Sequence, residues 1–199
     1  MGEDLSKIIP RWEWRTFGES FGEAEEQIKA NEIKTEKRSA EVYILSTESM
    51  QNTKVRDGLM DIKVLQNINE DGLEQWKPVF KEAFPLNKEQ IIEVFKFFQV
   101  GVSELKKDVY SFDEFLEELI NPCEKLKAIN VTKIRHIYNI NDCIVELAEV
   151  TGDGKPIRTV AVEQEDPKKV IETVEQLGLK DFENVNYIKA LKRLVDMFT

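Results

Sequence analysis

Charged and apolar residues alternate along several short segments of this chain. The clearest case lies at residues 11–17, where charged residues at 11, 13 and 15 alternate with tryptophans at 12 and 14. Side chains two residues apart project from the same face of a strand, so this pattern predicts a β-strand with one charged and one aromatic face. The same reasoning predicts further strands at about 40–46, 53–56, 59–65, 73–84, 128–140, 143–150 and 157–165.

Elsewhere the apolar residues recur every three or four positions, which is typical of amphipathic helices. Such helices are expected at about 19–30, 87–99, 112–120, 167–178 and 183–197. The helices at 87–99 and 112–120 interrupt the run of strands, and together they are too short to form a core of their own. We therefore interpret about 87–121 as a helical insertion in one α+β domain of residues 1–199, whose strands form an antiparallel sheet.

Five pairs of charged residues stand two positions apart on the predicted strands. They are Glu13 with Arg15, Lys54 with Arg56, Asp61 with Lys63, Lys133 with Arg135, and Glu163 with Glu165. If the strands form a closed sheet, these charges either cover its outer surface or line its interior, and both arrangements agree with the alternation. The predicted helices could cover the apolar face. An antiparallel β-barrel with a charged lumen and an apolar, helix-covered exterior is therefore self-consistent.

A lumen that carries both signs of charge would suit a polyphosphate anion. Lysine and arginine side chains bind phosphate oxygens, and arginine can do so through two parallel hydrogen bonds. Carboxylates in the same lumen would repel the anion unless a divalent cation joined the two. Mg²⁺ and Mn²⁺ favour oxygen ligands and commonly bind carboxylates together with substrate phosphates.

The overall charge and composition narrow the range of partners. The net charge of −10 at pH 7 argues against nucleic acid, whose binding proteins normally carry a basic surface. No segment approaches the roughly 20 apolar residues that a membrane helix needs, so no membrane partner is expected. Cys123 and Cys143 form no recognisable disulfide framework, which favours reduced thiols and a cytoplasmic location. The oligomeric state is left open.

The charged residues, in their order along the chain, resemble the CYTH family, also called the triphosphate tunnel metalloenzymes. The first strand of that family carries the pattern E-x-E-x-K, and the matching segment here places Arg11, Glu13 and Arg15 at its three charged positions. Arg11 thus stands where the family has its first Glu. The remaining matches, within about residues 10–195, are Lys54, Arg56, Lys63, Lys133, Arg135, Glu149, Arg158, Glu163, Glu165 and the pair Asn186-Tyr187.

The resemblance implies a triphosphatase-type phosphohydrolase. The reaction would be metal-dependent hydrolysis of inorganic triphosphate, another short polyphosphate or an organic triphosphate inside a β-tunnel. The residues implied to bind phosphate are Arg15, Lys54, Arg56, Lys63, Lys133, Arg135 and Arg158, with Arg15 and Lys63 also implied to be catalytic. The residues implied to hold Mg²⁺ or Mn²⁺ are Glu13, Glu149, Glu163 and Glu165.

Two alternatives remain beside hydrolysis. Arg11 favours a non-catalytic module that binds polyphosphate or a nucleotide, because it removes a metal ligand and adds positive charge. A class IV adenylyl cyclase, which the same family includes, is the other. All three share one expected geometry, in which the ten residues of the five charged pairs point into one open, hydrated cavity. The residues expected to pack outward, under the helices at 19–30, 87–99, 167–178 and 183–197, are Trp12, Trp14, Val55, Ile62, Ile134 and Val162.

Overall fold

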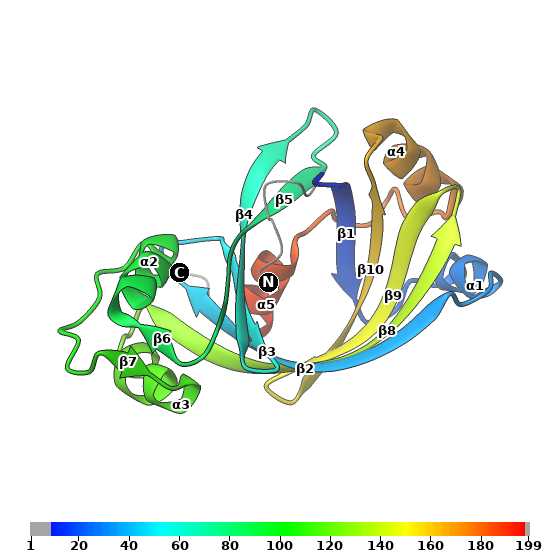
Figure 1. The fold of residues 1–199 in the computed structure, drawn as a ribbon. Helices are drawn as coiled ribbons and strands as arrows, with labels where there is room; N and C mark the ends of the chain where they lie inside the picture. The colour runs from blue at the N-terminus through cyan, green and yellow to red at the C-terminus, as the bar shows by residue number, and fades with distance from the viewer. Residues whose placement is uncertain (1–8, 198–199) are drawn as a thin grey trace.

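The computed structural model describes residues 9–197, which form a strand-rich chain with helices at its edges and near its C-terminus (Figure 1). The strands are β1 (Trp12–Gly18), β2 (Thr35–Ser46), β3 (Asn52–Arg56), β4 (Leu59–Ile68), β5 (Glu74–Ala83), β6 (Leu86–Asn87), β7 (Val109–Tyr110), β8 (Leu126–Ile140), β9 (Cys143–Gly152) and β10 (Lys155–Gln164). The helices are α1 (Glu23–Lys29), α2 (Lys88–Phe98), α3 (Phe112–Glu114), the π-helix η2 (Phe115–Ile120), α4 (Pro167–Gln176) and α5 (Tyr187–Leu194). None of these described helices is long and apolar enough to cross a membrane.

Eight of the strands form one antiparallel sheet that closes on itself. Their order around the ring is β1-β10-β9-β8-β2-β3-β4-β5. The ring closes where Trp12 and Glu13 of β1 pair with Gln75 and Glu74 of β5. The mixed α+β class and the antiparallel sheet predicted from the alternation are therefore confirmed.

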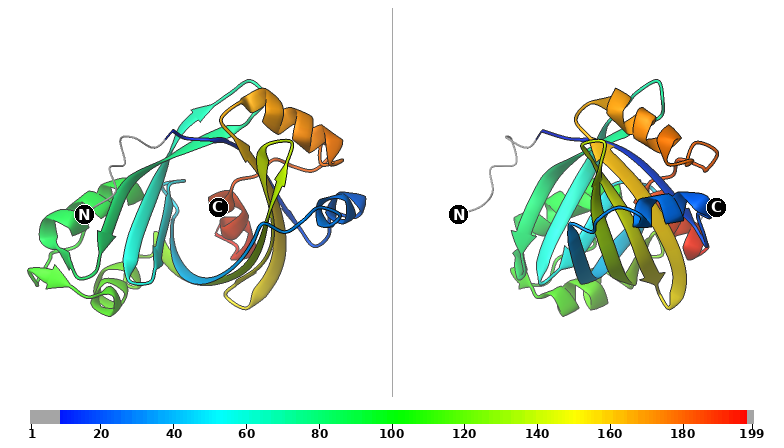
Figure 2. Two further views of the ribbon diagram at one scale, coloured as in Figure 1. Left: turned by 45° about the vertical axis from the view of Figure 1, so that its right-hand side comes forward. Right: turned by 90° about the vertical axis from the view of Figure 1, so that its right-hand side faces the viewer.

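Two apolar clusters lie on the outside of the ring. The helices that cover them lie on opposite sides of the ring (Figure 2). On one side α1 and α4 pack over β1 and β8–β10, with Trp14 and Val162 in the cluster and Trp12 against it. On the other side α2 and η2 pack over β2–β5, around Val55 and Ile62. These five side chains face outward as predicted, because the apolar positions of each strand lie on the face that the helices bury.

Helix α5 lies inside the ring, which corrects the expectation that residues 183–197 pack outside it (Figure 2). A third apolar cluster joins Tyr187, Ile188 and Leu191 of α5 to inward-facing residues of the strands, such as Val131 and Val150. An amphipathic stripe predicts that a helix buries one face, but not on which side of a sheet. One end of the interior is consequently an apolar core, and the polar cavity occupies only the rest.

Hydrogen bonds fix the start of α5 within the ring. The Arg15 carbonyl accepts a hydrogen bond from the Val185 N–H at 2.7 Å, and the Arg15 N–H donates to Asn184 Oδ1 at 3.0 Å. Asn186 caps the helix and its Nδ2 also donates to Glu74 Oε1 on β5 at 3.1 Å. The segment before α5 therefore ties β1 and β5 together at the seam where the sheet closes.

Candidate anion-binding site

A cavity of about 140 Å³ occupies the part of the ring interior that α5 leaves open. Among the described residues, five basic and three acidic side chains line it, together with uncharged neighbours. The charged ones are Glu13, Arg15, Lys54, Lys63, Lys133, Arg135, Glu146 and Glu163, and the others are Tyr43, Asn52, Trp76 and Tyr187. A second pocket of about 290 Å³ shares Glu13, Lys63, Trp76 and Glu163 with the cavity and forms its mouth.

Most of the residues predicted to face one cavity do so. Seven of the ten line it directly, and Asp61 lines the mouth with Arg11. Arg56 lies at the rim, with 44% of its side chain exposed and its Nη1 3.5 Å from Glu41. Glu165 lies beyond the end of β10 and is exposed, so it takes no part in the cavity.

Glu149 and Arg158 face the outside of the ring, so the structure does not bring these two predicted site residues into the cavity. Arg158 forms a bidentate ion pair with Glu25 of α1, with its Nη2 donating to Glu25 Oε1 at 2.6 Å. Glu149 is exposed and lies opposite Ile134, in a groove on the outer face. Paired residues share a face of the sheet. Glu149 and Arg158 pair with each other, so both lie on the face that points away from the cavity.

The inward carboxylate on β9 is Glu146 rather than Glu149. Strands β8 and β9 are joined by a tight turn in which Asn141 and Asp142 both have positive φ, and the register places Arg135 opposite Ala148. Even-numbered residues of β9 consequently face inward with the odd-numbered residues of β8. A two-residue turn at 141–142 fixes the register of this hairpin, so recognising that turn in the sequence could have identified Glu146 as the inward residue.

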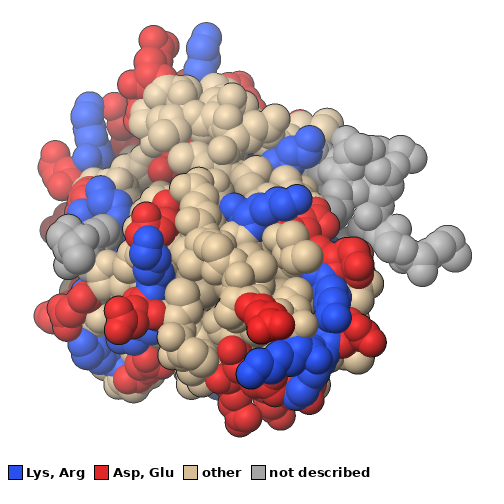
Figure 3. Space-filling view, turned by 90° about the vertical axis from the view of Figure 1, so that its left-hand side faces the viewer, with Lys and Arg blue, Asp and Glu red and all other residues tan. Residues whose placement is uncertain are grey.

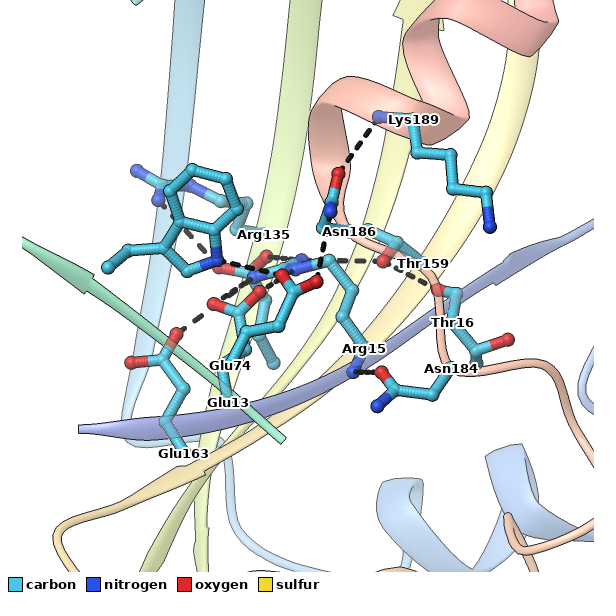
Figure 4. A network of polar contacts seen from close by, with 12 residues as sticks. Glu13, Arg15, Thr16, Glu74, Arg135, Thr159, Glu163, Asn184, Asn186 and Lys189 are labelled. Carbon is cyan, nitrogen blue, oxygen red and sulfur yellow. Dashed lines mark hydrogen bonds and ion pairs between the residues drawn. The ribbon is translucent and has the colours of Figure 1, made fainter. Parts of the chain in front are cut away.

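Arg15 forms the centre of an acidic wall of the cavity (Figure 4). Its Nε donates to Glu13 Oε1 at 2.8 Å and its Nη2 to Glu13 Oε2 at 3.3 Å. Its Nη1 donates to Glu146 Oε1 at 3.1 Å and to Thr159 Oγ1 at 3.3 Å, while Glu163 Oε1 lies 3.9 Å from Nη2. Four of the five N–H groups of the guanidinium thus have acceptors in the protein, and only 7% of its side chain is exposed.

The two carboxylates that face each other across β1 and β10 have opposite pKa shifts. Glu13 and Glu163 are directly paired in the sheet. Burial alone would raise the pKa of Glu13, but the adjacent Arg15 guanidinium lowers it. Burial raises the pKa of Glu163, and the negative charge of Glu13 raises it further. The wall therefore holds a proton on Glu163 more readily than on Glu13.

Lys133 lies against the opposite wall in an aromatic and carboxylate cage. Its Nζ donates to Tyr43 Oη at 2.7 Å and lies 2.8 Å from Glu41 Oε2. The same nitrogen lies 4.2 Å from the ring centroid of Tyr187 and 4.8 Å from that of Tyr43. Burial lowers the pKa of Lys133 to about 7, even though Glu41 opposes the shift. Lys133 therefore changes charge near neutral pH.

Glu41 is a buried counter-ion that no charged pair in the sequence pointed to. It lies on the inward face of β2, with none of its side chain exposed, within 3.8 Å of Lys54 and 3.5 Å of Arg56. Burial alone would raise its pKa, but Lys133 and Lys54 lower the pKa of Glu41 to about 2. A single carboxylate thus faces three basic side chains, so its one negative charge does not balance their positive charges.

The remaining basic residues of the cavity have few partners. Burial lowers the pKa of Lys54, whose Nζ lies 3.8 Å from Glu41 Oε2. No ion pair within 4.0 Å joins Lys63 to any described residue. Arg135 lies 3.7 Å from Glu146 Oε2, and its buried Nε has no hydrogen-bond partner in the described part of the chain. Buried donors are normally paired, so these groups indicate room for a bound acceptor.

The predicted set of metal ligands does not fit a divalent cation. Glu149 and Glu165 lie outside the cavity, and both oxygens of Glu13 accept hydrogen bonds from Arg15. Between residues 9 and 197, no group of three or more Asp, Glu, His or Cys side chains is arranged to hold a metal ion. We therefore derive no chemical step through Mg²⁺ or Mn²⁺.

Comparisons with known proteins find likeness at the level of the fold. The sequence matches no protein-family model and no curated protein. A conserved hypothetical protein from Pyrococcus furiosus is 18% identical, over 88% of this chain and 98% of its own, with a TM-score of 0.46. A protein from Pyrococcus horikoshii is 19% identical, over 88% and 97%, with a TM-score of 0.46. A candidate adenylate cyclase from Bacillus halodurans is 12% identical, over 92% and 98%, with a TM-score of 0.49. At these values the likeness transfers no function.

Proposed function

We propose that the interior cavity binds a short, phosphate-rich anion such as inorganic triphosphate or the polyphosphate end of a larger molecule. The observation that supports this most directly is the group formed by Lys54, Lys63 and Arg135. These three basic side chains face one small cavity with few acceptors in the protein, and the Nε of Arg135 is buried without a partner. Leaving such donors unpaired is costly, and an anion with several oxygens would satisfy them together.

The distribution of charge supports an anion rather than a cation. On the outer face that carries α2 and the small β6–β7 sheet, basic and acidic side chains are interspersed (Figure 3). In the cavity, by contrast, the basic side chains outnumber the acidic ones. A recessed positive site with walls of low dielectric can attract an anion even when the whole protein carries a charge of −10.

The mouth of the cavity extends the site toward solvent. Its charged lining combines Arg11, Lys63 and Lys81 with Glu13, Asp61 and Glu163, and Trp76 and Pro78 are among its apolar residues. Arg11, which departs from the family pattern, thus adds positive charge at the opening. A chain of phosphates longer than the inner cavity, or the organic part of a larger molecule, would lie in this pocket.

Isothermal titration calorimetry with inorganic triphosphate in EDTA tests the proposal. We expect one site per chain in the wild type and roughly 10–100-fold weaker binding for Arg135→Met, because a hydrogen bond to a charged group contributes about 1.5–3 kcal/mol. Arg158→Met is the matched control, since this arginine faces α1 instead of the cavity. Unchanged affinity in Arg135→Met, or an equal loss in the control, would refute binding in the cavity.

Hydrolysis and cyclase activity stay predictions of the family resemblance. The same protein, incubated with triphosphate or ATP and with Mg²⁺ or Mn²⁺, distinguishes them. Phosphate release that stops on chelation would assign the triphosphatase reaction, and formation of cyclic AMP would assign the cyclase. Binding without either product would assign the non-catalytic module that Arg11 favours.

A further inference from the structure

Three carboxylates from three strands meet on one wall of the cavity. Glu13 lies on β1, Glu146 on β9 and Glu163 on β10, and all three lie within 3.9 Å of one guanidinium. Clustered carboxylates repel one another, and in a phosphate-binding site a divalent cation commonly joins them to the phosphate oxygens. In this chain the space between the three carboxylates is filled by Arg15.

We propose that Arg15 is a resident cation that takes the place of a divalent metal in this cavity, so that the anion binds without metal. The inference rests on the proposed function for the identity of the anion. The occupation of the carboxylates by Arg15 is a separate observation, and it can be tested without any anion.

Backbone hydrogen bonds, in addition to those of the side chain, hold Arg15 in this position. Its N–H donates to Asn184 Oδ1 at 3.0 Å and its carbonyl accepts from the Val185 N–H at 2.7 Å, both from the segment that leads into α5. Its guanidinium lies 5.3 Å from the ring centroid of Tyr187 on α5. Moving Arg15 out of the carboxylate group would therefore disturb the helix that occupies one end of the ring interior.

The charges also argue that Arg15 is not the residue that grips the anion. Its donors point at carboxylate oxygens and at Thr159, while the basic residues with few acceptors lie elsewhere in the cavity. A divalent ion would have to displace four N–H···O hydrogen bonds in a site where only 7% of the arginine side chain is exposed. Arg15 instead neutralises carboxylates that would repel the anion, which makes it a positioning residue.

Electron paramagnetic resonance of Mn²⁺ added to the protein without any anion tests the inference. Wild type is expected to bind no Mn²⁺ in the cavity. Arg15→Met removes the guanidinium and leaves the three carboxylates unneutralised, so it is expected to gain one Mn²⁺ site. Adding Glu146→Gln to that variant should remove the gained site. Arg135→Met is the matched control, because Arg135 lies 3.7 Å from Glu146 and does not sit between the three carboxylates, and this variant should gain no site.

Two results of the Mn²⁺ experiment would overturn the inference. One is Mn²⁺ binding by the wild type that Glu13→Gln or Glu146→Gln abolishes. The other is a folded Arg15→Met variant that gains no Mn²⁺ site. If Arg15→Met does not fold, the wild type and its Glu146→Gln variant still decide the first point.

Titration with inorganic triphosphate in EDTA and in Mg²⁺ gives the separate readout. Binding in EDTA at least as tight as in Mg²⁺ supports the inference, and binding that requires Mg²⁺ contradicts it. No binding under either condition refutes the proposed function while the Mn²⁺ results stand on their own.

Discussion

Lys133 should make anion binding depend on pH near neutrality. Its pKa of about 7 means that roughly 90% of Lys133 is protonated at pH 6 and roughly 10% at pH 8. Affinity should fall as the pH rises, because the ammonium form of Lys133 is present below pH 7 and is lost as the pH rises through that value. An anion that contacts this side chain requires the charged form. Binding at pH 8 must therefore include protonation of Lys133, which costs about 1.4 kcal/mol and weakens affinity about tenfold relative to pH 6.

Calorimetry of inorganic triphosphate in wild type and in Lys133→Met measures this effect. The terminal phosphate also titrates near pH 6, and that contribution is common to both proteins. The ratio of affinities between pH 6 and pH 8 should therefore be about tenfold larger in the wild type than in the variant. A second readout is proton uptake at pH 8, seen as a dependence of the binding enthalpy on the buffer. It should disappear in Lys133→Met.

The reasoning would be refuted if the two proteins showed the same ratio. That result would mean that the anion does not contact Lys133, or that Lys133 is charged throughout this pH range. The contacts of Lys133 explain how it could stay charged throughout this range. Glu41 and Tyr43 satisfy the ammonium group, and a stronger interaction with Glu41 would keep it protonated well above neutral pH.

The remaining predictions concern the walls of the ring. Arg158→Met should lower the free energy of unfolding by about 2 kcal/mol in urea, because it breaks the charged hydrogen bonds to Glu25, and it should leave triphosphate affinity unchanged. Tyr187→Ala should cost about 3 kcal/mol in thermal unfolding, because it removes a buried ring from the contact between α5 and the sheet, and an unchanged midpoint would contradict the placement of α5. Glu146→Gln should lower stability at pH 7 by about 1–2 kcal/mol by weakening its bond to a buried arginine, whereas the matched Glu149→Gln should have no measurable effect.

The alternation along single strands predicted most of the cavity. Glu13 and Arg15 on β1, and Lys133 and Arg135 on β8, face inward because side-chain direction repeats every two residues within a strand. The same rule contradicts one predicted site residue. Arg158 lies five positions before Glu163 on β10, so the two must face opposite sides of the sheet.

The rest depended on contacts between distant segments. The placement of α5 inside the ring is not specified by its own amphipathic pattern, which would equally suit a helix on the outer surface. Glu41 stands alone among apolar and polar neighbours in the sequence, and its role follows only from the pairing of β2 with β8 and β3. The poor fit of the predicted ligands to a metal has a related origin, because the partners of Arg15 come from β1, β9 and β10 and cannot be inferred from the first strand alone.

A crystal structure of the protein with inorganic triphosphate in EDTA tests the central claim most directly. The account predicts phosphate density in the interior cavity, within hydrogen-bond distance of Lys54, Lys63 and Arg135, with Arg15 still bonded to Glu13. An empty cavity at saturating triphosphate, or triphosphate bound only on the outer surface of the ring, would contradict it.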